Sequence, residues 1–488
     1  MSELRIIRGN TVKTVTFRGT PLLDEVLEAA GMLQPHPCGG RGSCGKCAVT
    51  LTGNVSEPAP AERKAGTRLS CQAVLLGDAQ VRLSDDRETV QIETGNDTLA
   101  IQLNPVAGRI AAAVDIGTTT LAVKVYDLEN GRVLGTAAEL NPQTAVAADV
   151  MGRIDAAMKG KLSLMEHQIT ETLERLLGEA AGEKTVDTAV ITGNTTMLYL
   201  LTGRNPEPLS HAPFEADTLF GTDWKLDCLP VYLPPCMNAF VGADITCAVL
   251  ASGMWDREET GLLCDIGTNG EIALYHHGKL YVTSTAAGPA FEGAGISCGC
   301  GSVPGAIDRV WLENGSLAVH TIGEQEAVGI CGSGLIDAVA AALEAELVDE
   351  TGALDEDELE LSPGVCLQPR DIRAVQLAKA AIAAGIQVLL ETAGVGLEEV
   401  DRLYIAGGFG SHLNTESAAK IGLLPEQLLD RTVVLGNGAI AGAAMALLNR
   451  DNRQILTKIA AESVHVNLGG NPSFNEKYVE HMFFGEDE

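Results

Sequence analysis

The sequence predicts two domains of different fold class, a small α+β domain followed by a larger two-lobed α/β domain with an internal duplication. Three observations lead to this prediction. Four cysteines fall within the first 71 residues, whereas from Arg109 onward apolar strands alternate with long helical patterns. The tetrapeptide Asp-Ile-Gly-Thr occurs at Asp115 and again at Asp265. We expect a first domain at residues 1–88, a linker at 89–108 and a second domain at 109–488, with lobes at about 109–258 and 259–488.

Composition restricts the possible functions. The chain has 488 residues and a formal net charge of −31, with 45% hydrophobic and 20% charged residues. A polyanionic surface repels phosphate backbones and anionic membranes, so nucleic-acid and membrane partners are disfavoured. The longest apolar run, 439–448, is shorter than the ~20 residues that span a bilayer. The first 18 residues lack the apolar core of a signal peptide, so we expect a cytoplasmic protein.

The first domain shows a β-β-α-loop-β order. Gly9-Asn10 is a favoured hairpin turn between two short apolar strands. Gly31 ends the helical pattern that follows, and a cysteine-rich loop comes next. The expected elements are strands at Leu4–Ile7 and Val15–Phe17, a helix at Pro21–Ala30, and strands at Ala48–Leu51 and Gln80–Leu83.

The cysteine loop carries the strongest chemical signal in the chain. Cys38, Cys44 and Cys47 form a C-x₅-C-x₂-C pattern, and Cys71 follows from a separate segment. Plant-type ferredoxins hold a [2Fe–2S] cluster with C-x₄-C-x₂-C and a distant fourth cysteine, and the longer spacing occurs in the adrenodoxin-like branch of that fold. A structural zinc site is the alternative, but such sites prefer paired C-x₂-C units, and only one pair occurs here. The pattern therefore favours a β-grasp ferredoxin domain whose four cysteines hold a [2Fe–2S] cluster.

The second domain begins with a β-hairpin pattern that recurs in its second half. The copies are Ala113–Tyr126 and Leu263–Tyr275, each with Asp-Ile-Gly-Thr at its turn. Glycine in such a turn exposes N–H groups that bind anions, and neighbouring hydroxyls add donors. We expect Gly117, Thr118, Thr119, Gly267, Thr268 and Asn269 to contact phosphates. Asp115 and Asp265 would serve catalysis, one holding Mg²⁺ through water and the other orienting the attacking water.

Helices and buried strands are expected between and after these hairpins. The expected elements are a helix through Met165, Ile169, Leu173 and Leu176, a strand at Ala189–Thr192, a helix from Ile372 to Leu389, and a strand at Leu403–Ala406. The segment 344–361 carries nine acidic residues and no basic one. A solvated loop is the simpler interpretation of this segment, and a docking face is the alternative.

Four glycine-rich segments fit a nucleotide site less specifically. Gly407, Gly408 and Gly410 end a strand where an adenosine could lie against bare backbone, and Gly436–Ala444 and Phe240–Asp244 each start a helix. For each segment alone, close helix packing is the simpler interpretation. Gly332 and Ser333 open another helix, whose amides could bind phosphate or simply begin the helix. None of them is a Rossmann fingerprint.

Five of these elements resemble motifs of the superfamily of acetate and sugar kinases, heat-shock chaperones and actin. In chain order, the phosphate 1, connect 1, phosphate 2, adenosine and connect 2 motifs are matched by the hairpin at Asp115, Phe240–Asp244, the hairpin at Asp265, Gly407–Gly410 and Gly436–Ala444. The resemblance implies a two-lobed, actin-like, ribonuclease H-like duplicated ATPase domain that binds ATP and Mg²⁺ between its lobes. It places Asp244, in the connect 1 position, beside Asp115 and Asp265 as a catalytic residue.

The whole chain resembles the reductive activators of corrinoid-dependent enzymes. The motifs that carry this resemblance are the ferredoxin loop, Asp115-Ile-Gly-Thr-Thr-Thr, Thr192-Gly-Asn-Thr-Thr-Met, Cys264-Asp-Ile-Gly-Thr-Asn-Gly-Glu, Ala287-Gly-Pro-Ala-Phe-Glu-Gly and Ala406-Gly-Gly-Phe-Gly. The resemblance implies ATP-dependent transfer of one electron from the [2Fe–2S] cluster to Co(II) in a corrinoid-binding partner, which regenerates Co(I). It also implies an external low-potential electron donor and a homodimer.

The resemblance directs attention to the loop 287–300 as a place of corrinoid contact. Glu292 and Ser297 could approach or ligate cobalt, although a purely structural role for this loop is the simpler interpretation. Cys298 and Cys300 could hold a second cluster, although buried free thiols are the simpler interpretation. The polar segment 84–108, which includes the linker at 89–108, has about 25 residues and is shorter than the linker of many such activators, and no cysteine follows Cys366.

Three other functions remain open from the sequence. A small-molecule kinase with an appended redox domain is one, although no sugar-binding constellation is evident. An ATP-driven electron-transfer activator of another low-potential enzyme is a second. A redox sensor that holds nucleotide without turnover is a third, although pure binding does not require both Asp115 and Asp265.

Overall fold

The computed structural model describes residues 2–8, 11–32, 34, 40, 42, 45, 47–83, 103–407 and 413–485. The expected Gly9-Asn10 turn, Cys38, Cys44, Gly408, Gly410 and most of the 89–108 linker lie outside these residues. The chain forms two compact units, residues 1–88 with 141–169 and residues 89–140 with 170–488. Each unit is described by itself.

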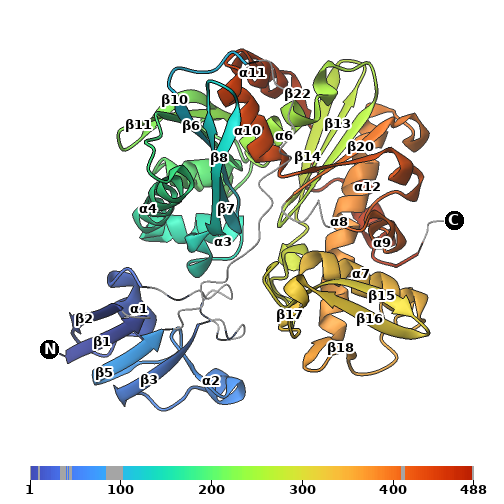
Figure 1. The fold of residues 1–488 in the computed structure, drawn as a ribbon. Coiled ribbons are helices and arrows are strands. Elements are labelled where there is room, and N and C mark those ends of the chain that lie inside the picture. Colours follow the sequence, from blue (N-terminus) through green and yellow to red (C-terminus); the bar gives the residue numbers. More distant parts are fainter. Residues whose placement is uncertain are drawn as a thin grey trace. The chain divides into compact units, whose positions relative to one another are not determined.

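The N-terminal residues form a five-stranded mixed sheet with two short helices, the β-grasp arrangement that the sequence predicted (Figure 1). Strands β1 and β5 pair in parallel, and the other pairs in the sheet order β2-β1-β5-β3-β4 are antiparallel. Helix α2 and strand β4 were not predicted. The elements are β1 Ser2–Arg8, β2 Thr11–Phe17, α1 Leu23–Ala29, β3 Ala48–Val55, α2 Pro60–Ala65, β4 Arg68–Leu69 and β5 Leu75–Leu83.

Local chemistry fixes helix α1 against this sheet. The carboxylate of Glu25 accepts a hydrogen bond of 3.1 Å from the amide of Leu22, which caps the first turn. Gly31 follows the helix at φ 70°, a conformation that favours glycine. The apolar face of α1 packs against the sheet, where Leu4, Ile6 and Leu27 are fully buried.

The same unit contains residues 141–169. The helical segments here are η1 Pro142–Ala145, α3 Val150–Ala156, η2 Ala157–Lys161 and the start of α4 Leu162–Ala181. Asp149 caps α3, because its Oδ1 accepts from the amide of Gly152 at 2.8 Å. The predicted helix through Met165 and Leu176 is confirmed as α4, with the apolar stripe buried.

The second unit contains two six-stranded sheets with the same central topology. In the first, β6, β7 and β8 are successive antiparallel strands, β9 pairs in parallel with β6, and β11 pairs in parallel with β9. The sheet order is β10-β11-β9-β6-β7-β8. The strands are β6 Ile110–Ile116, β7 Thr120–Asp127, β8 Arg132–Leu140, β9 Thr188–Gly193, β10 Phe220–Leu226 and β11 Leu229–Pro235.

The second sheet repeats this pattern. Strands β12, β13 and β14 are antiparallel, β20 pairs in parallel with β12, and β21 pairs in parallel with β20. The order β8-β7-β6-β9-β11 therefore corresponds to β14-β13-β12-β20-β21, which confirms the predicted duplication. The strands are β12 Gly261–Ile266, β13 Gly270–His276, β14 Lys279–Thr285, β20 Arg402–Ala406, β21 Thr432–Gly436 and β22 Ser463–His465.

Two small-residue helices pack against each other between these sheets (Figure 1). Helix α6 (Ala243–Ser252) follows the first sheet's β11, and helix α10 (Gly438–Leu448) follows the second sheet's β21. A Cβ added at Gly442 would lie 2.0 Å from the carbonyl oxygen of Cys247, so only glycine permits this approach. Close packing, the simpler interpretation of this glycine segment, is therefore correct for Gly442.

The remaining elements belong to both lobes, and most of them lie in the second. Strands β15, β16 and β17 form one small sheet and β18 and β19 another. The strands are β15 Ala306–Glu313, β16 Ser316–Thr321, β17 Gly329–Ile330, β18 Leu359–Ser362 and β19 Val365–Leu367. The α-helices are α5 Thr195–Leu201, α7 Gly332–Glu344, α8 Pro369–Ala393, α9 Thr415–Lys420, α11 Asn452–Glu462 and α12 Pro472–Glu480. The 3-10 helices are η3 Glu207–Leu209, η4 Met254–Asp256, η5 Pro289–Glu292, η6 Ile322–Glu324, η7 Leu397–Glu399 and η9 Glu426–Arg431.

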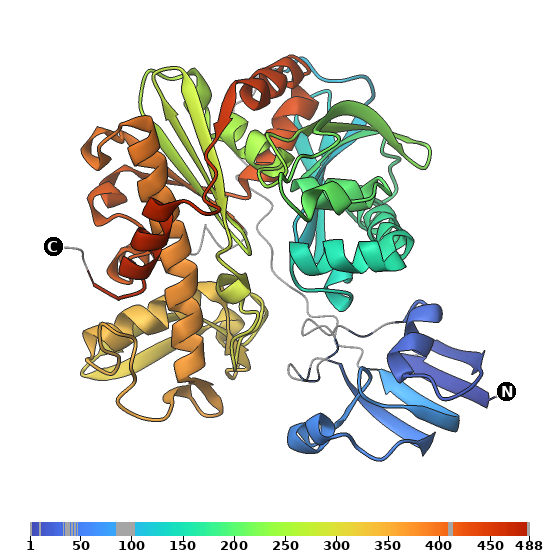
Figure 2. The ribbon, with the colours of Figure 1, turned by 180° about the vertical axis from the view of Figure 1, so that it is seen from behind.

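Helix α8 runs along the second lobe, from the six-stranded sheet to the small sheets (Figure 2). By length and composition it is the one helix among the described residues that could cross a membrane, but 78% of its most apolar stretch is buried in the protein. Its buried polar groups are satisfied internally: Gln376 donates to the carbonyl oxygens of Thr351 and Met482 at 2.9 and 2.8 Å. We therefore interpret α8 as a core helix.

Candidate functional site

The two Asp-Ile-Gly-Thr hairpins form tight turns. In the first, the amide of Gly117 donates to the carbonyl oxygen of Thr120 at 2.8 Å, and a Cβ at Gly117 would lie 2.8 Å from that same oxygen. In the second, the amide of Gly267 donates to the carbonyl oxygen of Asn269 at 3.2 Å. The sequence forms turns here because glycine permits the close approach.

Asp115 ends β6 and contacts a residue far away in the sequence. Nδ2 of Asn437 donates to Oδ2 of Asp115 at 2.8 Å, while Oδ1 of Asn437 accepts from the amide of Ile440 at 2.8 Å and caps α10. Burial raises the pKa of Asp115 to about 6, and the hydrogen bond from Asn437 opposes that rise. The N-terminus of α10 thus reaches the phosphate hairpin of the other lobe.

Asp244 and Asp265 complete a group of three carboxyls with Asp115. Burial, followed by the negative charges of Asp115 and Glu292, raises the pKa of Asp265 to about 7. Burial, followed by Asp265 and Asp115, raises the pKa of Asp244 to about 8. The three carboxyls that the sequence assigned to catalysis are therefore close enough to influence one another.

The same carboxyls fit a nucleotide-bound Mg²⁺ ion. Burial raises the pKa of all three carboxyls, so a bound cation would favour their ionised forms. No group of three or more ligand side chains, among the residues that the structure describes, could hold a metal directly. Mg²⁺ commonly binds through one or two carboxylates, several waters and substrate phosphates, which matches this donor set.

Hydroxyl groups from both hairpins meet near these carboxyls. The side chains of Thr119 and Thr268 approach to 3.4 Å between their Oγ1 atoms, although they come from different lobes. Nδ2 of Asn194 donates to Oγ1 of Thr118 at 3.0 Å, and Asn194 also caps α5. The predicted phosphate contacts Thr118, Thr119 and Thr268 therefore lie on the facing ends of the two hairpins.

The remaining predicted nucleotide residues divide into two groups. Gly407 has φ 118°, and a Cβ there would lie 2.5 Å from the carbonyl oxygen of Ile266 and 3.2 Å from Oδ1 of Asp265, so it is at the site. A Cβ at Gly332 would lie 1.8 Å from the carbonyl oxygen of Phe291 in η5, and Oγ of Ser333 lies 3.3 Å from Sγ of Cys331. The contacts of Gly332 and Ser333 are thus packing contacts at the start of α7.

Sequence reasoning missed three residues of the site, Glu271, Asn437 and Asn194. Glu271 pairs with Asp265 across β12 and β13 and is 6% exposed. Burial, followed by Asp244 and Asp265, raises its pKa well above the ordinary value, and a hydrogen bond from Asn269 opposes this. An alignment of the two motif copies would have pointed to Glu271, because this charged residue stands where the first copy has the apolar Leu121.

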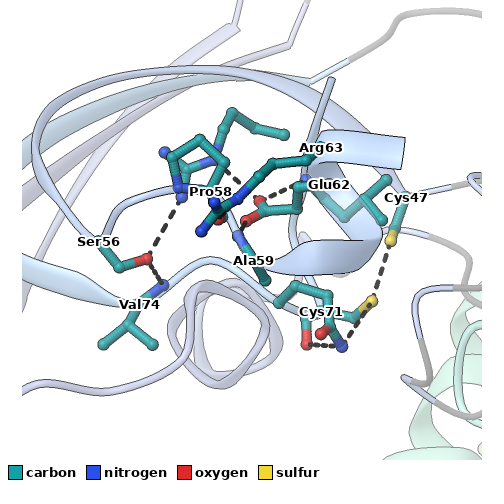
Figure 3. Close-up of polar contacts among 11 residues, drawn as sticks. Cys47, Ser56, Pro58, Ala59, Glu62, Arg63, Cys71 and Val74 are labelled. Atoms are coloured by element: carbon teal, nitrogen blue, oxygen red, sulfur yellow. Dashed lines mark hydrogen bonds and ion pairs between the residues drawn. The ribbon is translucent and has the colours of Figure 1, made fainter. Parts of the chain in front are cut away.

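The described part of the cysteine site lies in the N-terminal sheet domain (Figure 3). Sγ of Cys47 and Sγ of Cys71 are 3.3 Å apart, and both residues are buried. Burial, followed by the neighbouring Cys47, raises the pKa of the Cys71 thiol to about 12. Two converging thiols fit cluster ligation, in which the thiols are deprotonated on metal binding.

A buried carboxylate holds the segment that carries Cys71 (Figure 3). Glu62 accepts hydrogen bonds from the amides of Ala59 and Leu69 at 2.6 and 2.9 Å and from Nε of Arg68 at 2.8 Å. Burial, the largest influence, would raise the pKa of Glu62, but these donors outweigh it and lower the pKa. The hydrogen bonds to the ionised carboxylate of Glu62 therefore hold in place the segment that carries the fourth cysteine, Cys71.

The loop 287–300 has defined contacts. The amide and Oγ of Ser297 both donate to Oδ1 of Asp371, at 2.9 and 3.0 Å. Glu292 contacts the two hairpins. Cys298 and Cys300 are half-buried, not buried as expected, and no group of three metal-ligating side chains includes them within the described residues. The approach of Glu292 and Ser297 to cobalt stays a prediction.

Comparisons with known proteins agree across the chain. The family model described as "C-terminal domain of RACo the ASKHA domain" matches residues 259–488, "RACo middle region" matches 110–257, and "2Fe-2S iron-sulfur cluster binding domain" matches 6–76. The N-terminal residues are also similar to a component of the Na(+)-translocating NADH-quinone reductase from Chlamydia muridarum, 31% identical over 91 residues, 17% of this chain and 21% of that one.

Other known proteins are similar to this chain over most of its length. The corrinoid activation enzyme RamQ from Eubacterium limosum is 35% identical over 418 residues, 77% of this chain and 70% of that protein. A [Co(II) methylated amine-specific corrinoid protein] reductase from Methanosarcina barkeri is 27% identical over 412 residues, 75% of each chain. The solved structure of a "Reductive activator for corrinoid,iron-sulfur protein" is similar with a TM-score of 0.74 and 27% identity, over 99% of this chain and 98% of that one.

Proposed function

Given that this chain belongs to the family of reductive activators of corrinoid proteins, we propose that it is an ATP-hydrolysing reductase that transfers one electron to inactive Co(II) in a corrinoid protein and regenerates Co(I). The observation that carries the proposal is the union, in one chain, of a [2Fe–2S] domain and a duplicated ATPase domain, which together match a solved reductive activator over 98% of its length.

In this proposal the cysteines position the redox centre. Cys38, Cys44, Cys47 and Cys71 would hold the cluster, which supplies one-electron transfer when bound. The proximity of the Cys47 and Cys71 thiols, 3.3 Å apart, supports the assignment of two of the four ligands. Glu62 keeps the Cys71 segment in place through its bonds to Arg68 and Leu69.

The carboxyls at the facing hairpins would serve ATP hydrolysis. Mg²⁺, when bound with ATP, neutralises phosphate charge during phosphoryl transfer. Asp115, Asp265 and Asp244 would carry this chemistry, one through water-mediated contact with the ion and another by orienting the attacking water. Gly117, Gly267 and the hydroxyls of Thr118, Thr119 and Thr268 would bind phosphates, and Gly407 with Gly408 and Gly410 would line the nucleoside side.

Helices α6 and α10 each follow one sheet and influence the aspartate of the other sheet. This arrangement supports a coupling between nucleotide binding and the relative position of the two lobes. Helix α6 follows the first sheet, yet the charge of its Asp244 acts on Asp265 in the second. Helix α10 follows the second sheet, yet its Asn437 bonds Asp115 in the first. Because a nucleotide between the hairpins would contact both sets, its binding and hydrolysis would change how the lobes close, and this change would drive the electron transfer.

Several finer points belong to the same proposal. We place the ferredoxin domain at residues 1–88, the linker at 89–108 and the ATPase domain at 109–488. The electron reaches the chain from an external low-potential donor, and the protein acts in the cytoplasm as a homodimer. The net charge of −31 disfavours nucleic acid as a partner.

The test is anaerobic purification followed by titration with a corrinoid protein. The proposal predicts one [2Fe–2S] cluster per chain and an ATPase rate that rises when the Co(II) partner is added. Asp265→Asn should abolish that rate and leave the cluster spectrum unchanged. A colourless protein whose thiols at 38, 44, 47 and 71 all react with an alkylating agent would contradict the proposal, and stable phosphorylation of an added sugar would favour the kinase alternative.

A further inference from the structure

The carboxylate of Glu292 occupies hydrogen-bond donors that a phosphate group requires. Oε1 accepts from the amide of Thr268 at 3.0 Å, and Oε2 accepts from the hydroxyl of Thr268 at 2.7 Å. Oε2 also accepts from the hydroxyl of Thr119, on the hairpin of the other lobe. One side chain thus bridges both hairpins through three donors.

The three hydrogen bonds to Glu292 are of the kind that a bound phosphate group forms. A carboxylate and a phosphate are both anions whose oxygens accept from backbone N–H and hydroxyl groups, and charge-assisted bonds of this kind are the strong ones. Two anions cannot share the same three donors, because each would lose its bonds and repel the other. A Cβ at Gly267 would lie 3.3 Å from Oε1 of Glu292, so this carboxylate lies against the phosphate-loop glycine itself.

The acidic group Asp265 lies close enough to Glu292 to be influenced by it. The negative charge of Glu292, together with that of Asp115, contributes to the raised pKa of Asp265. Glu292 is therefore held by hydrogen bonds in an acidic environment. A nucleotide phosphate would arrive with Mg²⁺, whose charge compensates the carboxyls, whereas Glu292 brings no cation. The exchange would replace a carboxylate without a cation by a phosphate group that carries its own cation.

The segment that carries Glu292 is connected to the rest of the second lobe. The 3-10 helix η5 lies between Gly288, at φ 83°, and Gly293, at φ 73°, and both angles favour glycine. A Cβ added at Gly332 would lie 1.8 Å from the carbonyl oxygen of Phe291, so η5 packs directly on the start of α7. Displacement of Glu292 would therefore disturb the contact between η5 and α7.

We propose that Glu292 determines phosphate selectivity: its carboxylate takes the hydrogen-bond donors that a nucleotide phosphate group needs and is displaced when a triphosphate binds. The inference rests on the proposed function, because it assumes that nucleotide binds between the hairpins. Displacement of Glu292 releases the direct link between Thr119 and Thr268 and frees η5, so the loop 287–300 reports the occupancy of the phosphate site.

The test compares nucleotide affinities of wild type and Glu292→Gln by titration calorimetry with MgAMPPNP and with AMP. Glutamine keeps the size of the side chain but loses the charge, so we expect the Kd of MgAMPPNP to fall by about tenfold, ~1.4 kcal/mol. The Kd of AMP, which lacks the competing phosphates, should not change. Glu313→Gln, an exposed substitution in β15 that removes the same charge, should leave both values unchanged.

A second measurement uses the wild-type protein alone, so that a folding defect in the variant does not decide the outcome. Hydrogen exchange of residues 287–300 should increase when MgAMPPNP binds and should not increase with AMP. Equal or weaker binding of MgAMPPNP by the Gln variant, or exchange that falls on binding, would overturn the inference. If the wild type bound neither nucleotide, the proposed function would fall together with it.

Discussion

Replacing Asp265 by Asn should make the ligand-free protein more stable while destroying its ATPase activity. Asp265 has a pKa raised from its ordinary 3.8 to about 7, chiefly by burial. At about 1.4 kcal/mol per pH unit, this corresponds to a ceiling of about 4 kcal/mol. Because the side chain is half-buried, solvent screening reduces the expected gain to about 2 kcal/mol.

The sign of the effect depends on pH. A carboxyl with a raised pKa is harder to ionise in the folded state, so wild-type stability falls as pH rises from about 4 to about 7. The gain from the Asp265→Asn substitution should therefore be complete above pH 7, smaller at pH 5 and absent below the ordinary pKa. Urea unfolding at pH 8 and pH 5, followed by tryptophan fluorescence, measures this difference directly.

Two controls make the result interpretable. Asp430→Asn, an exposed substitution in η9, should leave stability unchanged at both pH values. MgAMPPNP should stabilise the wild type and not the Asp265→Asn variant, because one of the carboxyls that attract the ion is lost. An Asp265→Asn variant that is no more stable than wild type at pH 8, or that gains equally at pH 5, would refute the electrostatic interpretation of the site.

Two further predictions follow from single contacts. Asn437→Ala removes a helix cap worth about 1 kcal/mol and the donor that opposes the rise in the pKa of Asp115, so the acidic limb of the ATPase pH profile should move to higher pH. Gly442→Ala places a Cβ 2.0 Å from the carbonyl oxygen of Cys247, and thermal unfolding should show a loss of more than about 3 kcal/mol. Gly178→Ala in α4, with no atom within 4 Å of the new Cβ, should be neutral or stabilising.

Local patterns explain why much of the fold could be predicted. The strands β1 and β2, the hairpins at Asp115 and Asp265 and helix α8 all carry periodic apolar residues or turn glycines within a short window. Elements β4 and α2 could not be predicted this way. Strand β4 has only two residues, and α2 has six with no apolar stripe, so tertiary contacts such as those of Glu62 define them.

The sequence predicted individual residues of the candidate site but not the contacts between them. Sequence spacing indicated Asp115 and Asp265 because each lies in its own hairpin motif. The bond between Asn437 and Asp115 joins residues 322 positions apart, and that between Thr119 and Glu292 joins residues 173 apart. No local pattern encodes such pairings, since they arise from the packing of the duplicated lobes. The sequence therefore suggested only cobalt contact or a structural role for Glu292, whose carboxylate in the structure bridges the phosphate hairpins.

The central claim is that nucleotide hydrolysis drives electron transfer to cobalt. The most direct measurement is the optical change from Co(II) to Co(I) in a corrinoid partner mixed anaerobically with the reduced protein, with MgATP, with MgAMPPNP and without nucleotide. The account predicts Co(I) formation with MgATP and little or none in the other two mixtures or with Asp265→Asn. Equal Co(I) formation without nucleotide, or with that variant, would contradict it.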